Sequence, residues 1–267
     1  MPFGQVRDLN LYYELVGIGP RLLFINGTNA DLRRKQPYVD KLNDHFTVLR
    51  YDQRGLGQTE KPDQHYSMAD YADDAAALMD LVGWDQAAVL GVSFGGSVAQ
   101  ELVRRHPQRI TRLALACANP GGPYGYPLLE LHAKDPATRA RTMLSLDLRK
   151  SLEWQAAHPE EAEKLLEMGR KRGGPVDPSD QHAAMGARRQ LEAREEHDAR
   201  GWIDQISVPT GLFGGRYDLL GTEAGQQFMA NRIAGSEMQL FEGAHGFLNE
   251  DANAVPAIIE FLTRAPT

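Results

Sequence analysis

The chain has 267 residues and a mass of 29.6 kDa, which is enough for one large α/β domain or two small ones. Apolar residues make up 42% of it and charged residues 24%, so the composition favours a folded globular protein and excludes a largely disordered one. The formal net charge of −7 argues against a general binder of nucleic acid or of membrane surfaces.

The cysteine content and the N-terminal residues narrow the expected location. Cys117 is the only cysteine, which excludes an internal disulfide and a cysteine-cluster metal site, and its apolar neighbours predict a buried small side chain. Residues 1–8 contain no positively charged segment followed by an apolar stretch, so they do not resemble a secretory signal. No apolar run approaches the roughly 18 residues needed to span a membrane. We therefore expect a cytoplasmic protein in a reducing compartment.

Short apolar stretches predict the strands of a sheet. Residues 3–7 and 10–16 alternate in part between apolar and polar side chains and predict an antiparallel hairpin. Later apolar runs each end in a polar loop, as is typical of strands buried on both faces. These runs are residues 21–26, 46–51, 87–92, 110–117, 210–213 and 237–241.

Helical patterns fall between these runs. Within residues 67–82 the apolar positions follow a 3.6-residue spacing, and Ser67 with Asp70 resembles a capping box. Residues 98–105 and 254–262 also predict helices. Alternating strands and helices predict an α/β fold with a mostly parallel, eight-stranded sheet covered on both faces.

The alternation stops between residues 119 and 200. This stretch contains no good strand and is rich in Ala, Glu, Arg and Leu, so we expect a helical insertion between two strands of the sheet. The predicted organisation is an α/β core formed by residues 1–118 and 201–267, with residues 119–200 as a helical cap.

The first chemical motif is Gly91-Val92-Ser93-Phe94-Gly95, between the predicted strand 87–92 and the predicted helix 98–105. A Gly-x-Ser-x-Gly sequence at a strand-to-helix turn places the serine at the apex, and the flanking glycines remove side chains that would collide there. Ser93 is therefore the candidate nucleophile. The alternative is a glycine-rich turn with an incidental serine.

A serine hydroxyl becomes a good nucleophile only when a base removes its proton. His245 is the candidate base, because its small-residue loop directly follows the predicted strand 237–241, where α/β sheets carry their sites. The other histidines lie beside charged, polar or helix-ending residues, and we expect each to be a solvated surface group: His45, His65, His106, His132, His158, His182 and His197.

The imidazole needs a carboxylate that fixes its tautomer and stabilises its charged form. Asp218 follows another predicted strand, and the loop after the strand 110–117 offers no competing carboxylate. The alternative is that Asp218 only starts the turn before a helix near residue 222.

An acyl-transfer site also needs donors for the oxyanion. The N–H of Phe94, the residue after the nucleophile, is the first candidate. The second comes from the loop after residues 21–26, where we expect Thr28 N–H, with Gly27 N–H as the alternative.

These features resemble an α/β-hydrolase-fold serine hydrolase over essentially the whole chain. The order Ser93, Asp218, His245 is the chain order of that fold's triad. Residues 51–59, Tyr-Asp-Gln-Arg-Gly-Leu-Gly-Gln-Thr, resemble the Asp-x-Arg-Gly-x-Gly-x-Ser segment of many members, whose Asp and Arg tie loops together beside the nucleophile. The chain departs from many members in carrying Asn26-Gly27 in place of His-Gly.

Within that superfamily, residues 26–32 and 51–59 are similar to the 3-oxoadipate enol-lactone hydrolase group. Related esterases, carbon–carbon bond hydrolases and cofactor-free perhydrolases share much of the pattern. Dehalogenases and epoxide hydrolases of the same fold use Asp as the nucleophile, which Ser93 disfavours.

In such hydrolases the segment between the sixth and seventh strands caps the nucleophile and shapes substrate choice. One or two arginines of residues 120–200 suit a substrate carboxylate, although their accompanying glutamates predict mainly a solvated surface of mixed charge. The basic residues are Arg139, Arg141, Arg149, Lys150, Arg170, Lys171, Arg172, Arg188, Arg189 and Arg194.

The sequence therefore predicts a serine hydrolase that cleaves a small-molecule carboxylic ester or lactone through an acyl-enzyme. This chemistry needs no metal or organic cofactor. Two alternatives stay open. The same triad supports hydrolysis of a carbon–carbon bond or perhydrolysis by peroxide, and, more distantly, the fold holds a ligand without turnover.

Overall fold

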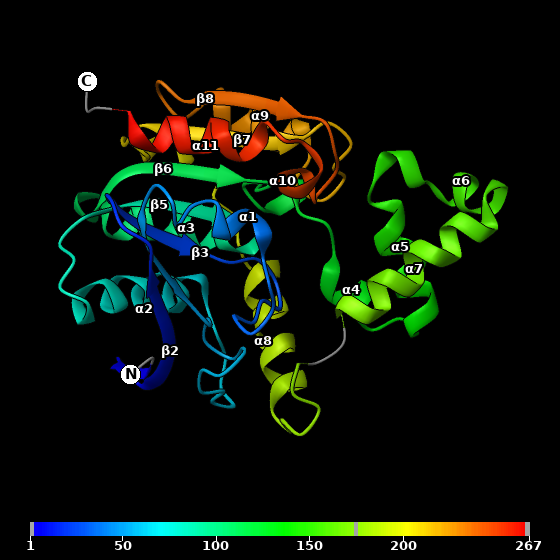
Figure 1. Cartoon of the computed structure of the whole chain (residues 1–267), viewed down its shortest axis with the longest axis horizontal. Coiled ribbons are helices and arrows are strands. Elements are labelled where there is room, and N and C mark those ends of the chain that lie inside the picture. The colour runs from blue at the N-terminus through cyan, green and yellow to red at the C-terminus, as the bar shows by residue number, and fades with distance from the viewer. Residues whose placement is uncertain (1–2, 174–175, 265–267) are drawn as a thin grey trace.

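The computed structural model describes residues 3–173 and 176–264 (Figure 1). These residues form one sheet of eight strands, in the spatial order β1-β2-β4-β3-β5-β6-β7-β8. β1 pairs with β2 and β2 with β4 in antiparallel fashion, and every later pair is parallel. The predicted hairpin and the mostly parallel sheet are confirmed. The strands are β1 Phe3–Val6, β2 Leu9–Val16, β3 Arg21–Ile25, β4 Thr47–Tyr51, β5 Ala87–Val92, β6 Ile110–Ala116, β7 Thr210–Gly215 and β8 Glu237–Phe241.

Helices connect the strands. The α-helices in the described part of the chain are α1 Pro37–Asp40, α2 Met68–Leu81, α3 Phe94–Arg105, α4 Leu128–His132, α5 Pro136–Ser145, α6 Leu152–Ala157, α7 Pro159–Gly173, α8 Ala183–Glu195, α9 Glu223–Ala230, α10 Phe247–Glu250 and α11 Ala254–Thr263. Short 3₁₀ helices lie at η1 Pro107–Arg109, η2 Gly122–Tyr124, η3 Leu148–Lys150 and η4 Ile203–Gln205. Within the ranges just given, no helix combines the length and the apolar character that crossing a membrane requires.

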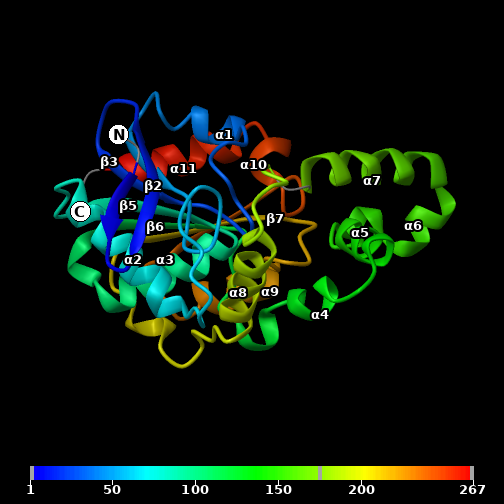
Figure 2. The same ribbon diagram turned by 90° about the horizontal axis from the view of Figure 1, so that it is seen from below.

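The sheet is covered on both faces (Figures 1 and 2). On one face α2, α3 and α9 pack over a core that includes Leu78 and Val98. On the other face α1, α10 and α11 pack over a core that includes Phe247 and Ile258. The central strand β5 is buried at all 6 positions, as expected for a parallel strand between two helical layers. Its carboxyl end is therefore a rigid base for the residues that follow it.

Local signals explain where α2 and α3 begin. The Ser67 hydroxyl accepts the Asp70 N–H, and the Asp70 carboxylate accepts the Ser67 N–H, so the predicted capping box starts α2. The prediction that the next helix begins at residue 98 is wrong, because α3 begins at Phe94, directly after Ser93. The Gly-x-Ser-x-Gly turn thus leads into the helix with no intervening loop.

The chain between β6 and β7 carries α4 to α8 and forms no strand among its described residues. α5, α6 and α7 gather to one side of the sheet, whereas α8 returns toward it (Figures 1 and 2). Backbone hydrogen bonds join the group to the loop after β7, where Leu148 N–H donates to Tyr217 O and Leu219 N–H donates to Leu146 O, both at 2.9 Å. The division into a core and a cap at residues 119–200 remains a prediction.

Candidate active site

Ser93 occupies the sharp turn between β5 and α3. Its φ of +55° lies in the left-handed region that residues with side chains rarely adopt, and such strain is concentrated at functional sites. A Cβ on Gly91 would collide with the Gly95 carbonyl oxygen, and a Cβ on Gly95 would collide with the carbonyl oxygen of Ile25. The glycines on both sides of Ser93 are therefore required by the close approach of α3 to β3 and β5.

The structure brings Ser93 together with residues from the loops after β7 and β8. His245 Nε2 lies 2.8 Å from Ser93 Oγ, and His245 Nδ1 lies 2.8 Å from Asp218 Oδ2. The Asp218 side chain is fully buried, and its Oδ1 accepts the Leu220 N–H at 2.8 Å. A carboxylate that accepts from Nδ1–H leaves Nε2 free to accept the serine proton.

Electrostatics keep the two partners of Ser93 in complementary charge states. Burial by itself raises the pKa of Asp218, but the neighbouring His245 and the backbone N–H donors outweigh it, so the pKa lies below its ordinary value. Burial by itself lowers the pKa of His245, but contacts with Cys117 and with the Asp218 carboxylate raise that pKa well above its ordinary value. Asp218 is therefore the anion of the pair.

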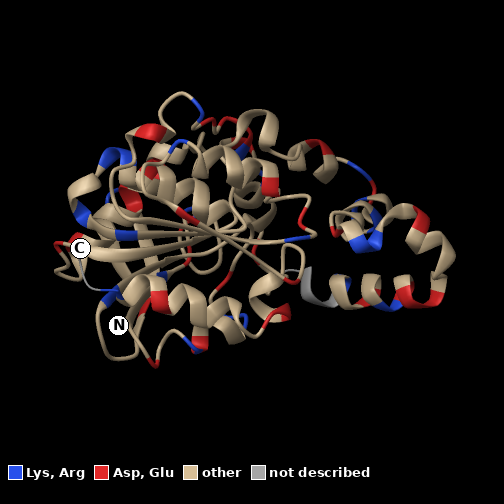
Figure 3. Ribbon diagram, turned by 90° about the horizontal axis from the view of Figure 1, so that it is seen from above, with Lys and Arg blue, Asp and Glu red and all other residues tan. Residues whose placement is uncertain are grey.

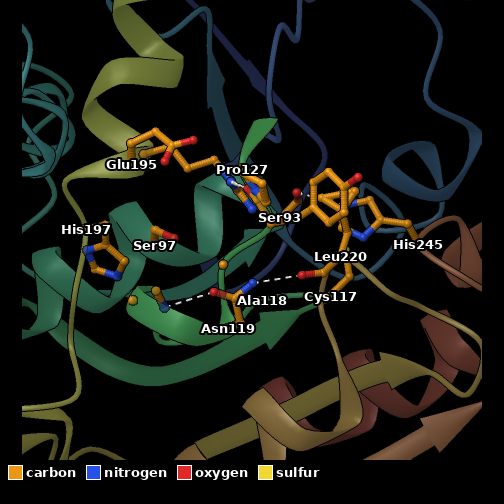
Figure 4. A pocket seen from close by; sticks show the side chains of 15 residues that line it. Ser93, Ser97, Cys117, Ala118, Asn119, Pro127, Glu195, His197, Leu220 and His245 are labelled. Atoms are coloured by element: carbon orange, nitrogen blue, oxygen red, sulfur yellow. Dashed lines mark hydrogen bonds between the residues drawn. The ribbon is translucent and has the colours of Figure 1, made fainter. Parts of the chain in front are cut away.

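Cys117 directly follows β6 and has a φ of +43°. Its side chain is buried, so the predicted burial is confirmed. It also borders the same cavity as Ser93 and His245 (Figure 4). The side chain is therefore part of the site rather than only of the core.

The candidate oxyanion donors lie on either side of Ser93. A Cβ built on Gly27 would be 3.5 Å from the Ser93 Cβ, which brings the loop after β3 against the serine. Gly27 N–H donates to Asn26 Oδ1 at 3.1 Å. Within the described residues, the N–H groups of Thr28 and Phe94 donate to no protein acceptor. Of the two predicted loop donors, Thr28 is thus the one with a free N–H.

The loop that carries Thr28 is held by side chains that the sequence did not single out. Asn26 Oδ1 accepts from the Gln36 amide at 3.1 Å, and the Asn26 carbonyl accepts from the Gln53 amide at 2.8 Å. Asn29, at a φ of +55°, donates its N–H to Gln190 Oε1 of α8 at 2.8 Å. A buried glutamine on a helix far along the chain gives no local sequence signal for such a contact.

A cavity of about 230 Å³ opens beside Ser93 and His245 (Figure 4). Its walls come from α3, from the loop after β6 and from the end of α8. They are unusually polar for a ligand pocket, most of which are lined mainly by apolar side chains. Besides the two triad candidates and Cys117, the polar side chains in the walls are Ser97, Asn119, Tyr126, Arg194, Glu195 and His197.

The prediction that His197 is solvated is wrong. It is 6% exposed. It lies seven residues after the buried Gln190 and four after the buried Ala193 of α8, and this helical spacing can be seen in the sequence. The Gln100 amide donates to Asn119 O, so its Oε1 faces His197 and accepts from the ring Nε2 at 3.2 Å. Burial lowers the pKa of His197 to about 4, so the ring is neutral near pH 7.

The remaining histidines divide by exposure. His106 is half-buried and its Nε2 lies 2.9 Å from Asp73 Oδ1, so it is not the fully solvated group that was predicted. The others are exposed as predicted: His45, His65, His132, His158 and His182.

Residues 20–252 match the family model described as the alpha/beta hydrolase fold. The chain belongs to this family. The match spans β3 to β8 and includes Ser93, Asp218 and His245. It confirms the fold predicted from the sequence.

Named relatives of this α/β hydrolase cover most of its length. The poly(3-hydroxyalkanoate) depolymerase of Ectopseudomonas oleovorans is 27% identical over 253 residues, covering 90% of this chain and 83% of the relative. The 3-oxoadipate enol-lactonase 2 of Acinetobacter baylyi is 26% identical over 248 residues, covering 90% and 87%. The crystal structure of the enol-lactonase from Burkholderia xenovorans LB400 has a TM-score of 0.77 at 26% identity and covers 98% of this chain and 100% of that one. These names confirm the predicted resemblance to hydrolase-fold enzymes, including the enol-lactonase group.

The hydrolase's Asp-x-Arg-Gly segment ties neighbouring loops together. Arg54 is 1% exposed and donates to Asp74 Oδ2 and to Asp8 Oδ1, each at 2.8 Å. Asp52 Oδ1 accepts the Leu32 N–H at 2.7 Å, which anchors the end of the Thr28 loop. Burial raises the pKa of Asp52 to about 6. Both charged residues therefore stabilise the loops around Ser93 and lie outside the cavity lining.

Proposed function

We propose that this α/β hydrolase cleaves a carboxylic ester or lactone through an acyl-enzyme formed on Ser93. The observation that carries the proposal is the continuous hydrogen-bonded line from Ser93 Oγ through His245 to the buried Asp218, with 2.8 Å at each step. Such a line combines the three parts that nucleophilic catalysis by serine requires: a nucleophile, a base and a group that orients the base.

The reaction follows from these roles. Ser93 Oγ attacks the ester carbonyl while His245 Nε2 takes its proton, and the resulting imidazolium is stabilised by Asp218. Collapse of the tetrahedral intermediate breaks the bond to the alcohol oxygen, which receives the proton from His245. A water molecule, deprotonated by His245, then attacks the acyl-enzyme, and release of the carboxylic acid returns the proton to Ser93.

The oxyanion of each tetrahedral intermediate would be stabilised by the N–H groups of Phe94 and Thr28. Both are unused within the described residues, whereas Gly27 N–H is engaged by Asn26. Unused backbone donors on either side of a nucleophile cost no rearrangement when the negative charge develops.

The relatives support the class of substrate. Poly(3-hydroxyalkanoate) depolymerase and 3-oxoadipate enol-lactonase are both names for enzymes whose substrates contain a carboxylic ester bond, open in the first and cyclic in the second. A small ester or lactone is therefore the substrate class that we assign to this chain.

A small fluorophosphonate tests the proposal. Intact-protein mass spectrometry should show one adduct on the wild type, no adduct on Ser93→Ala and a much slower reaction of His245→Ala. No adduct on a folded wild-type protein would contradict the proposal and favour a ligand-binding protein without turnover.

Turnover separates ester cleavage from the other reactions that the same triad supports. A panel of plain esters and lactones should be hydrolysed faster than a vinylogous diketone, and acid release should not depend on added peroxide. Preferential cleavage of the diketone would instead assign carbon–carbon bond hydrolysis.

A further inference from the structure

Arg194, at the end of α8, borders the cavity that contains Ser93 and His245. Its Nη1 donates to the Tyr126 carbonyl at 2.7 Å. No carboxylate lies within ion-pair distance of its guanidinium among the described residues. Burial lowers its pKa despite the nearby Glu195. A desolvated cation without a paired anion is costly to a protein, and such groups are usually kept for binding.

Ser97 supplies a second unused polar group in the same cavity. It lies in the first turn of α3, four residues after Ser93, and both residues border the cavity. The residue is 7% exposed, and its hydroxyl has no hydrogen-bond partner among the described residues. In Figure 4 Ser97 lies between His197 and Ser93 at the cavity wall. A hydroxyl that lines a cavity and makes no internal hydrogen bond is available to a ligand.

Most other described arginines of the α4–α8 helices pair with carboxylates, and Arg139, which donates to the His132 carbonyl, lies outside the cavity lining. Lys and Arg are interspersed with Asp and Glu over these helices (Figure 3). Arg170 pairs with Glu163 at 2.6 Å, and Arg188 pairs with Glu192 at 2.9 Å, so the predicted mixed-charge surface describes them well. The side chains of Lys171 and Arg172 lie outside the described residues.

Glu195 is the acidic group at the cavity. Its side chain is exposed, and its Oε1 accepts the Leu129 N–H at 3.3 Å, so its charge is hydrated at the cavity edge. His197 is neutral and donates away from the cavity wall to Gln100. Among the described cavity residues outside the triad, Arg194 therefore provides the positive charge.

We infer that Arg194 and Ser97 form an anion subsite, and that the ester or lactone cleaved at Ser93 carries a free carboxylate that binds there. The guanidinium offers further N–H donors in the planar fork that suits a carboxylate, and the Ser97 hydroxyl offers one more. The cavity volume of about 230 Å³ is below the usual range for drug-sized ligands, so the carboxylate belongs to a short chain or a small ring. This inference names the substrate class of the proposed hydrolase and rests on that proposal.

Two esters of equal chain length test the subsite: 4-nitrophenyl hydrogen adipate, which carries the carboxylate, and 4-nitrophenyl hexanoate, which does not. The wild type should prefer the adipate. Arg194→Gln should lower kcat/KM for the adipate by about 30-fold, chiefly through KM, because a charge-assisted contact is lost. Turnover of the hexanoate should fall much less, because this ester makes no charged contact with Arg194. Ser97→Ala should lower adipate turnover by about fivefold.

The matched control is Arg188→Gln on the same helix. The Arg188 side chain is 72% exposed, so this substitution should change the turnover of neither ester. An equal loss of both esters in Arg194→Gln would overturn the inference, because Arg194 would then only hold the Tyr126 loop. A wild type without preference for the adipate would overturn it while leaving the hydrolase proposal intact.

Binding provides a readout that does not depend on turnover. Monomethyl adipate should bind to Ser93→Ala protein in a calorimetric titration, and methyl hexanoate should bind more weakly. Adding Arg194→Gln should remove the preference, and adding Arg188→Gln should keep it. Equal binding of the two compounds to Ser93→Ala protein would reject the anion subsite even if the protein hydrolyses no ester.

Discussion

The carboxyl end of the sheet and the α4–α8 helices differ in how firmly their residues are held. Around Ser93, β5 is buried at all 6 positions and α3 lies so close to β3 that only glycine fits at position 95. In contrast, α5 contains no buried residue. The atoms assigned to bond making are thus fixed by packing on every side, whereas α5 lies outside the cavity lining and buries none of its side chains.

This difference teaches where chemistry and selectivity reside in the molecule. The triad candidates come from three loops of one rigid sheet, so their mutual distances depend on residues throughout the core. The anion subsite joins both regions, since Ser97 belongs to α3 and Arg194 to α8. Changes in α8 should therefore alter which substrate is bound, and changes at the sheet should alter how fast any substrate reacts.

The largest effect is expected from Asp218→Asn. The Asn amide nitrogen would donate to His245 Nδ1, so the ring would carry its proton on Nε2 and lose the ability to accept one from Ser93. We expect kcat to fall about ten-thousandfold with little change in thermal stability. The control is Asp147→Asn. The backbone of Asp147 pairs with that of Asp218 in an isolated antiparallel bridge, and this substitution should leave turnover almost unchanged. Retention of a tenth of the wild-type kcat in Asp218→Asn would contradict the assigned role.

The next effect concerns the buried ion pair beneath the site. Arg54→Met would leave the Asp74 carboxylate, 1% exposed, with only the exposed Arg7 as a charged partner among the described residues. We expect a loss of about 3–5 kcal/mol in the free energy of unfolding, measured by urea denaturation. Burial raises the pKa of Asp74, so protonation at low pH should reduce the loss.

Arg200→Met is the control for that variant, because Arg200 and Asp198 form an exposed pair at 2.7 Å. Its cost should stay below about 1 kcal/mol. An equal loss of unfolding free energy in Arg54→Met and Arg200→Met would show that burial of the ion pair does not set its contribution to stability.

A matched pair of glycine substitutions compares the regions directly. A Cβ at Gly95 would meet the carbonyl oxygens of Ile25 and Asn26, whereas a Cβ at Gly169 in α7 would meet no atom within 4 Å. Gly95→Ala should therefore cost about 1–3 kcal/mol, and Gly169→Ala should add about 0.5–1 kcal/mol by favouring the helix. Both are read from thermal denaturation, and a stabilised Gly95→Ala would refute the close approach of α3 to β3.

The sequence predicted best what is encoded locally. The strands, the capping box of Ser67 and the Gly-x-Ser-x-Gly turn each depend on neighbouring residues, and all are found where the pattern indicates. Ser93, Asp218 and His245 each follow a parallel strand. Because the carboxyl ends of parallel strands lie at one edge of a sheet, the sequence alone predicted that these three loops meet.

What the sequence did not predict depends on contacts between distant segments. His197 is buried because α8 packs back onto the sheet, and its charged neighbours Glu196 and Asp198 concealed that burial. The contact of Gln190 with Asn29 and the selection of Arg194 among many cap arginines have the same origin. Burial of a polar residue is set by tertiary packing and leaves little trace in composition.

The smallest effect concerns pH and Cys117. Ester cleavage requires neutral His245, whose pKa is raised, so kcat/KM should increase with pH through a pKa above the ordinary histidine value. Because the Cys117 contact helps to raise that pKa, Cys117→Ala should move the acidic limb to lower pH with little change in the plateau. Cys117→Ser keeps a polar contact and should leave the limb nearer to that of the wild type. A limb that stays in place in Cys117→Ala would assign the raised pKa to the Asp218 carboxylate alone.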